Sequence, residues 1–277
     1  MRRLDGNGEG DMGLCHADRR AAILLVAFGA SSAAARRVYD HIGETVQRHR
    51  PGHEIFWAFT SRRIVRRLRS EGIVLSTLEE AGALIKRREH RRLVLLPLLT
   101  VPGQEYANVV ACSFAGIQVA YCPPLLSKES DLPGVLHALE DQLREDAINV
   151  VVCHGNAKHD AYNDLLVKLA QAMESTHADC VVASVEGRPG TKPLQRAREI
   201  ARRVGHAHFI PFMMVPGEHV TNDVMGDKPE SWKNRVGAAA STCARALGFN
   251  RSVLSLFLKR LDEGFARLEL EKCHESI

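Results

Sequence analysis

The amino-acid sequence predicts an α/β protein of two similar lobes, each a doubly wound parallel sheet. Short, continuously apolar runs alternate with segments of helical period, which is the pattern of parallel strands buried under helices on both faces. Short motifs also recur in the same order in the two halves of the chain. We therefore expect a duplicated α/β unit, with one copy in each lobe.

Four strands are expected in the first half. The first is an apolar run that ends at Gly29, and the full set covers residues 23–28, 54–59, 93–98 and 117–121. A helix is expected at 34–49, and a second begins at a capping box at Ser76–Glu79 and continues to about residue 88. The arginine-rich stretch 62–69 is typical of a solvated helix face, with contact to an acidic ligand as the alternative.

The second half repeats this alternation. Strands are expected at residues 149–153, 180–185 and 208–215. Helices are expected at residues 161–175, 193–204, 227–246 and 252–270. Pro97 and Pro211 fall inside apolar runs, and because proline cannot donate a ladder hydrogen bond, we expect their strands to lie at a sheet edge or to end early.

Aligned motifs indicate the duplication. Val26–Gly29 matches Val152–Gly155 at an offset of 126 residues, and Val101–Glu105 matches Val215–His219 at an offset of 114. The seam between the halves is expected near residues 127–133, where polar residues precede a proline. The expected organisation is a flexible tail at 1–21, an N-terminal lobe at 22–130, and a C-terminal lobe at 131–277 whose last helix is free to pack back on the first lobe.

The composition excludes several classes of protein. The 277 residues carry 37 lysines plus arginines and 33 aspartates plus glutamates, a formal net charge of +4. The basic residues are interspersed with acids, so no nucleic-acid partner is expected, and the apolar runs are too short to cross a membrane. Seven cysteines without a C-x-x-C motif indicate reduced thiols in the cytoplasm. A homo-oligomer is compatible with this composition.

Three side chains that can bind metal follow strands of the second half, namely His154, Glu186 and His219. Ligands of open parallel sheets bind beyond the carboxyl ends of the strands, so we expect these side chains to share one edge. Two imidazoles and a carboxylate suit a divalent metal of borderline softness that keeps open positions. Glu105 takes the place of His219 in the first half, and Cys153 is expected to pack on the opposite face from His154.

Each of these residues also has an ordinary structural interpretation. A histidine after a strand is commonly a loop residue, and Glu186 before a glycine is a candidate helix cap. The joint pattern nevertheless resembles that of the anaerobic cobalt chelatases of the CbiK family, which insert cobalt into sirohydrochlorin in the oxygen-independent route to cobalamin. The resemblance extends from about residue 22 onward and depends on the segments 26–29, 58–62, 101–106, 153–156, 185–189 and 214–227.

The resemblance implies a chelatase fold of two lobes related by pseudo-twofold symmetry, with a cleft between them and a site for metal insertion. The implied metal ligands are His154, Glu186 and His219. The implied catalytic groups are His154 and Glu105. The implied substrate-binding residues are Phe28, Gly29, Ala30 and Gly103. The sequence departs from the family at Leu99, where a histidine is expected.

Metal insertion into a tetrapyrrole requires two N–H protons to leave and the metal to lose water. Neutral imidazoles hold the cation and accept those protons. The resemblance implies Co²⁺ and sirohydrochlorin as the substrates. Fe²⁺, Ni²⁺ or Zn²⁺ are further ions for the site, because affinity alone does not select cobalt. No organic cofactor is expected. Iron insertion toward siroheme, a non-catalytic tetrapyrrole or metal carrier, and a metallohydrolase with the same ligands stay open as alternatives.

Overall fold

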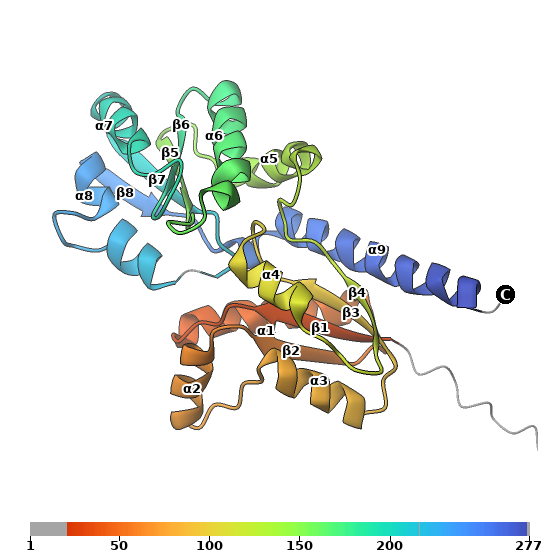
Figure 1. Cartoon of the computed structure of the whole chain (residues 1–277). Helices are drawn as coiled ribbons and strands as arrows, with labels where there is room; N and C mark the ends of the chain where they lie inside the picture. Colours follow the sequence, from red (N-terminus) through yellow and green to blue (C-terminus); the bar gives the residue numbers. More distant parts are fainter. Residues whose placement is uncertain (1–20, 216, 276–277) are drawn as a thin grey trace, which may run out of the picture.

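The computed structural model describes residues 21–215 and 217–275, without the side chains of 271–275. The expected tail at residues 1–21 therefore lies almost wholly outside the described residues. Within them the chain forms two lobes, one below the other in Figure 1, and each lobe is built on a four-stranded parallel sheet flanked by helices. The predicted fold class is confirmed.

The N-terminal sheet has the strand order β2-β1-β3-β4. Its strands are β1 (Ala22–Ala27), β2 (Ile55–Phe59), β3 (Arg92–Pro97) and β4 (Gln118–Tyr121). Its helices are α1 (Ala33–His49), α2 (Arg62–Ser70), α3 (Leu78–Arg87) and α4 (Gln104–Ala111). All six residues of β1 are buried, and alternate residues contribute to separate apolar cores on the two faces of the sheet.

The C-terminal sheet repeats this order as β6-β5-β7-β8. Its strands are β5 (Ile148–Cys153), β6 (Cys180–Ser184), β7 (His206–Pro211) and β8 (Ala240–Cys243). Its helices are α5 (Leu132–Glu140), α6 (Asp164–Thr176), α7 (Pro193–Val204), α8 (Trp232–Val236) and the long α9 (Arg251–Glu275). β1 and β5 are offset by 126 residues (148 − 22), and β3 and β7 by 114 (206 − 92), so the motif offsets match those of the strands.

Pro97 and Pro211 end the third strand of each sheet, and these strands are not at an edge. The amide after each proline supplies the ladder bond instead: Leu98 donates to Val26, and Phe212 donates to the corresponding residue of β5. The nitrogen of Pro97 faces the β4 side, where β4 has already ended. Of the two expected alternatives, the edge position is wrong and the early end is confirmed, because the strands end at Pro97 and Pro211 rather than at residues 98 and 215. The prolines are tolerated because they are the last residues of their strands.

Two other local expectations are corrected, and two short helices were not expected. The helix expected at 227–246 is only the five residues of α8, because Gly237 adopts a φ of 65° and the chain then enters β8. The capping box is one residue later than expected and joins Thr77 to Glu80. Helices α4 and α5 were not expected, because eight and nine residues are too few to show a clear period.

Helix α9 crosses from the C-terminal lobe to the N-terminal lobe and runs along its sheet (Figure 1). Asp262 of α9 pairs with Arg50, and Arg260 pairs with Asp131 at the start of the second lobe. Residues of α1, α5, α6 and α9 belong to one apolar core that reaches both sheets. The lobes are thus packed together rather than joined only by a linker. None of the helices in the described part of the chain is long and apolar enough to span a membrane.

Candidate metal-binding site

His154 and Glu186 follow two neighbouring strands and are joined through their backbones. His154 is the first residue after β5, and the amide N–H of Glu186, just beyond β6, donates to its carbonyl oxygen at 2.8 Å. Both side chains are exposed. The parallel pairing of β5 and β6 therefore brings together two residues that are 32 positions apart (186 − 154) in the sequence.

His219 reaches the same edge from the chain that follows β7. It begins a π-helical turn, His219–Val224, which the sequence analysis did not anticipate. The imidazole of His219 meets that of His154 edge to face, with the ring centroids 5.1 Å apart and the planes at 81°. Two of the three expected ligands are therefore in direct contact.

Both imidazoles are held through Nδ1. Nδ1 of His154 is 2.9 Å from the carbonyl oxygen of Gly155, and Nδ1 of His219 is 2.6 Å from a carboxylate oxygen of Asp223. These oxygens only accept hydrogen bonds, so each neutral ring carries its proton on Nδ1 and leaves the lone pair of Nε2 free to bind a cation. A carboxylate behind a ligating histidine is a common feature of metal sites.

The carboxylate of Glu186 does not complete a three-ligand cluster in this conformation. Among the described residues, no group of three or more His, Cys, Asp or Glu side chains is placed to hold a metal ion. Glu186 lies on an exposed loop between buried β6 and Gly187. The assignment of all three ligands stays a prediction.

The loops that carry these residues are closely packed against each other. Gly155 has a φ of 76°, and a Cβ atom there would collide with the carbonyl oxygen of Glu186. Gly187 has a φ of 62°, and a Cβ atom there would collide with the carbonyl oxygen of Asn156. Glycine is therefore required at both positions, for backbone conformation and for space.

Cys153 lies on the other side of the strand from His154. Its side chain is fully buried in the core between the lobes. Burial raises the pKa of the Cys153 thiol, so the thiolate that a metal ligand requires is strongly disfavoured. Cys153 is a packing residue, as the strand alternation indicated.

The expected first-lobe residues lie near the ends of β1 and β3. Phe28 follows β1 and is 48% exposed, a high value for a phenylalanine. Gly29 has a φ of 109°, and Ala30 is buried. Gly103 is the N-cap of α4, and a Cβ atom there would be 4.0 Å from Tyr162 of the second lobe.

Glu105 is half-buried in the first turn of α4, which lies where the two lobes meet (Figure 1). The offset of 114 between β3 and β7 also separates Glu105 from His219 (219 − 105). The two residues thus occupy equivalent positions in the duplicated fold, each in the helical segment after the third strand of its sheet. The loop before α4 also includes Leu99, whose carbonyl oxygen accepts the amide N–H of Leu125.

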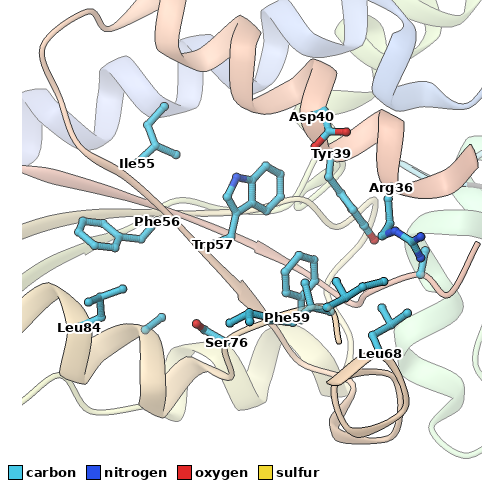
Figure 2. Close-up of a pocket in the computed structure, with 15 residues that line it drawn as sticks. Arg36, Tyr39, Asp40, Ile55, Phe56, Trp57, Phe59, Leu68, Ser76 and Leu84 are labelled. Carbon is cyan, nitrogen blue, oxygen red and sulfur yellow. The ribbon is translucent and has the colours of Figure 1, made fainter. Parts of the chain in front are cut away.

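A cavity of about 420 Å³ lies elsewhere, along the outer edge of β2. Figure 2 shows Tyr39, Trp57 and Phe59 on its wall, and the rings of Trp57 and Phe59 are stacked 5.9 Å apart. Ala30 also lines this cavity. The residues that line this cavity do not include any of the predicted metal ligands, His154, Glu186 and His219.

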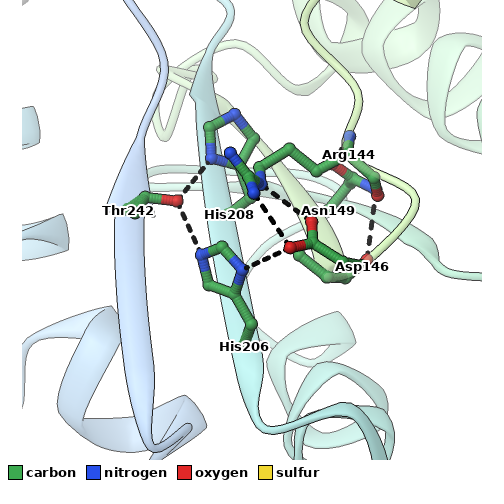
Figure 3. Close-up of polar contacts among 7 residues, drawn as sticks. Arg144, Asp146, Asn149, His206, His208 and Thr242 are labelled. Carbon is green, nitrogen blue, oxygen red and sulfur yellow. Dashed lines mark hydrogen bonds and ion pairs between the residues drawn. The ribbon is translucent and has the colours of Figure 1, made fainter.

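Two further histidines lie on β7, close to its start and therefore at the opposite end of the C-terminal sheet. His206 and His208 both hydrogen bond to the hydroxyl of Thr242, at 2.8 and 2.7 Å (Figure 3). Asp146 lies 3.7 Å from the other side of His206 and forms a paired hydrogen bond with Arg144. These contacts tie β7 to β8 and to the turn before β5, which is a structural role.

The comparison with known proteins decides the family. The cobalt chelatase (CbiK) family matches residues 21–266. The chain belongs to this family. Sirohydrochlorin cobaltochelatase of Salmonella typhimurium is 29% identical to this CbiK-family protein over 226 residues, which are 77% of this chain and 84% of that protein. Sirohydrochlorin cobaltochelatase CbiKC of Nitratidesulfovibrio vulgaris is 26% identical over 243 residues, 82% of this chain and 83% of that protein.

Solved structures share the fold of this CbiK-family protein. SirB from Bacillus subtilis with Fe³⁺ superposes with a TM-score of 0.59 at 15% identity, over 90% of this chain and 97% of that chain. CbiX, described as the terminal enzyme of siroheme biosynthesis in denitrifying bacteria, superposes with a TM-score of 0.56 at 18% identity, over 87% and 98% of the two chains. At these identities the likeness shows the two-lobed arrangement alone.

Proposed function

We propose that this protein is a sirohydrochlorin cobaltochelatase, which inserts Co²⁺ into sirohydrochlorin during anaerobic cobalamin biosynthesis. The contact between His154 and His219 carries the proposal, because it presents two imidazole rings side by side at the carboxyl edge of a parallel sheet. Membership of the cobalt chelatase family and the names of the two relatives support it.

In this proposal His154 and His219 bind the incoming metal through Nε2, and Glu186 is the third ligand. The carboxylate offsets one of the two positive charges, and the metal keeps positions for water and then for the pyrrole nitrogens. The exposure of the site suits an ion that must arrive, be transferred and leave with the product. The hydrogen bonds to Gly155 and Asp223 fix the two ring orientations before the ion binds.

The reaction replaces two N–H bonds of the macrocycle by bonds to the metal and releases two protons. We assign proton acceptance to His154 and Glu105. His154 is chosen because it is a proposed ligand of the metal. Glu105 is chosen because it occupies the position in the first lobe that His219 occupies in the second. Once the metal leaves Nε2 of His154, that nitrogen regains its lone pair and takes up a proton.

We assign substrate contacts to Phe28, Gly29, Ala30 and Gly103. The exposed ring of Phe28 offers a flat apolar surface on which a macrocycle can stack. Gly29 and Gly103 allow close approach of the backbone, since neither has a side chain. Ala30 is buried, so its contribution would come from the backbone.

The proposed metal substrate is Co²⁺, although the same donors also bind Fe²⁺, Ni²⁺ and Zn²⁺. The proposal includes no organic cofactor, no nucleic-acid or membrane partner, a cytoplasmic location and no fixed oligomeric state. Selection of cobalt would then depend on supply and on the geometry of transfer, because nickel and copper bind nitrogen and oxygen donors more tightly than cobalt.

The test is metal insertion itself. Purified protein is mixed without oxygen with sirohydrochlorin and Co²⁺, and the change in the tetrapyrrole absorbance is followed against a protein-free control. We expect a rate well above that control, which His154→Ala and His219→Ala reduce to the control rate. His137→Ala is the matched control, because His137 lies on the exposed surface of α5 and its removal should leave the rate unchanged.

Other outcomes identify the alternatives. A rate equal to that of the control, with metal or tetrapyrrole still bound, indicates a carrier and contradicts the proposal. Faster insertion of Fe²⁺ than of Co²⁺ under matched conditions indicates an enzyme for siroheme and contradicts the cobalt assignment. Full activity of both histidine variants contradicts the proposed site.

A further inference from the structure

Asn163 is a buried polar residue that lies behind the candidate site. It is completely buried at the end of a short 3₁₀ turn and is followed directly by α6. Its Oδ1 accepts the backbone N–H of Asn156 at 2.8 Å, and its Nδ2 donates to the carbonyl oxygen of the same residue at 2.9 Å. The side chain thus satisfies both backbone groups of one residue in the loop after β5.

The same amide group lies against the loop after β6. A Cβ atom at Gly187 would be 2.6 Å from Nδ2 of Asn163 and would also collide with the carbonyl oxygen of Asn156. Asn163 therefore touches both loops. Asn156 is two residues after His154, and Gly187 is one residue after Glu186, so the contact is directly behind two of the proposed ligands.

Ion pairs on the exposed surface link the same two segments. Arg188 pairs with Asp160 at 2.7 Å and with Asp164 at 3.0 Å, which links the loop after β6 to the segment that carries Asn163. These side chains are 46% to 70% exposed, so the pairs contribute little on their own. The buried amide, which has no water to replace its partners, is the dominant part of the contact.

We propose that Asn163 is a positioning residue that fixes the separation of His154 and Glu186 for metal binding. The inference rests on the proposed function, since it takes these two residues as ligands. Asn163 does not touch the metal or the tetrapyrrole. It holds the two ligand loops at one spacing before the ion arrives, so that only side chains have to adjust.

The chemistry requires an asparagine at this position. One atom of the side chain must accept from an N–H group while the other donates to a carbonyl oxygen. Aspartate has the same shape, but its carboxylate lacks the donor and would face the carbonyl oxygen of Asn156. Asn163→Asp therefore breaks one half of the contact without creating a large cavity.

Asn149 provides a matched control at the opposite end of β5. Its Oδ1 accepts the backbone N–H of Arg144 at 2.9 Å, and its Nδ2 donates to the carbonyl oxygen of Arg144 at 2.9 Å (Figure 3). The residue is also buried, at 4% exposed. Asn149→Asp thus removes the same kind of contact near the start of β5, whereas Asn163 contacts the loop that follows the end of this strand.

The experiment titrates the purified full chain with Co²⁺ alone and follows the visible d–d absorption of the bound ion. We expect Asn163→Asp to weaken Co²⁺ binding by about 10- to 100-fold and to change the d–d spectrum at saturation. Asn149→Asp should lower the melting temperature by a similar amount but leave the Co²⁺ affinity within about twofold of the wild type. Equal Co²⁺ affinity and equal spectra in both variants would overturn the positioning role.

A second pair of variants covers the case in which Asn163→Asp does not fold. Gly187→Ala places a Cβ atom against Asn163 and Asn156, whereas Gly205→Ala, at a similar φ of 74°, meets nothing within 4 Å. Both substitutions strain the backbone, but only Gly187→Ala should weaken Co²⁺ binding, again by about tenfold or more. Equal Co²⁺ affinity in this pair would also overturn the inference.

His154→Ala in the same titration separates the two proposals. If it leaves Co²⁺ binding unchanged, the proposed metal site is wrong, and the proposed role of Asn163 is then wrong as well. If His154→Ala abolishes binding while Asn163→Asp does not weaken it, the metal site stands and only the positioning role is wrong.

Discussion

The imidazoles of His154 and His219 meet edge to face, with centroids 5.1 Å apart, although the residues are 65 positions apart (219 − 154) in the chain. The parallel sheet accounts for this meeting, because the ends of β5 and β7 are neighbours at its carboxyl edge. Each ring donates through Nδ1 to an oxygen atom. The pair is therefore oriented before any ion binds.

Asp223 is expected to contribute to metal affinity through His219. Asp223→Ala removes the acceptor at Nδ1, so the ring can rotate or shift its proton to Nε2, the nitrogen that must bind metal. We expect Co²⁺ affinity to fall by about 10- to 100-fold, measured by titration of the d–d absorption. The matched control is Asp227→Ala, because Asp227 pairs with Lys233 on the surface. Equal affinity of the two variants would contradict a role for Asp223.

The sequence predicted the lobes well because their strands are apolar on both faces. Every residue of β1 and β5 is buried, and such runs are visible without knowledge of their partners. β8 was missed because it is a short, largely exposed edge strand whose structure comes from pairing with β7. Its residues 240–243 have no apolar pattern, and only the tertiary pairing distinguishes them from a helix or a loop.

Part of the candidate site could also be predicted from the sequence. His154 and His219 could be grouped because both follow strands, and strand ends meet at one edge. The contact between His219 and Asp223 was missed, although its spacing of four residues is a signal that a helical turn would bring the two together. Asn163 gives no such signal, because its partners come from two loops that only the fold brings together.

The ion pair between Asp131 and Arg260 is expected to stabilise the attachment of α9. Arg260 is 10% exposed in its side chain, and Asp131 also accepts two hydrogen bonds from Ser127. Asp131→Ala leaves the guanidinium buried without its carboxylate, and we expect the free energy of unfolding to fall by about 3 kcal/mol. Urea unfolding measures this change.

The control for this pair is Glu71→Ala. Glu71 pairs with Arg67 on the exposed surface of α2, and its loss should cost at most about 0.5 kcal/mol. If both variants lose the same small amount, the pair between Asp131 and Arg260 does not stabilise the protein.

Two glycines in helices should respond in opposite directions to alanine. A Cβ atom at Gly264 of α9 would be 2.6 Å from Val94 and 3.0 Å from Cys122, so Gly264→Ala overpacks the contact with the N-terminal sheet. We expect it to destabilise the protein by about 1–3 kcal/mol. At Gly134 of α5 the nearest contact is an ordinary 3.5 Å, to Leu256, and Gly134→Ala should stabilise by about 0.5–1 kcal/mol. Thermal unfolding of both variants tests the packing of α9, and a stabilising effect of Gly264→Ala would contradict it.

His208 is expected to make the protein less stable in acid. Burial lowers the pKa of His208, and the positive charges of Arg144 and His206 lower it further, while a hydrogen bond to the carbonyl of Gln142 and the charge of Asp146 oppose the shift. The unfolded chain, with a histidine pKa of about 6.5, therefore binds a proton before the folded chain does. Stability is fully present above that value and is lost as the pH falls from it through the lowered pKa of the folded state.

The variant that tests this is His208→Gln, which keeps a polar side chain toward Thr242 but cannot titrate. We expect the variant to have a lower free energy of unfolding than the wild type at pH 7.5, because the contacts of the ring are lost. Between pH 7.5 and 5, its free energy of unfolding should decrease less than that of the wild type. Urea unfolding at a series of pH values measures both. His137→Gln is the control, because this ring lies on the exposed surface of α5. A slope for His208→Gln equal to that of the wild type would show that His208 does not cause the loss of stability in acid.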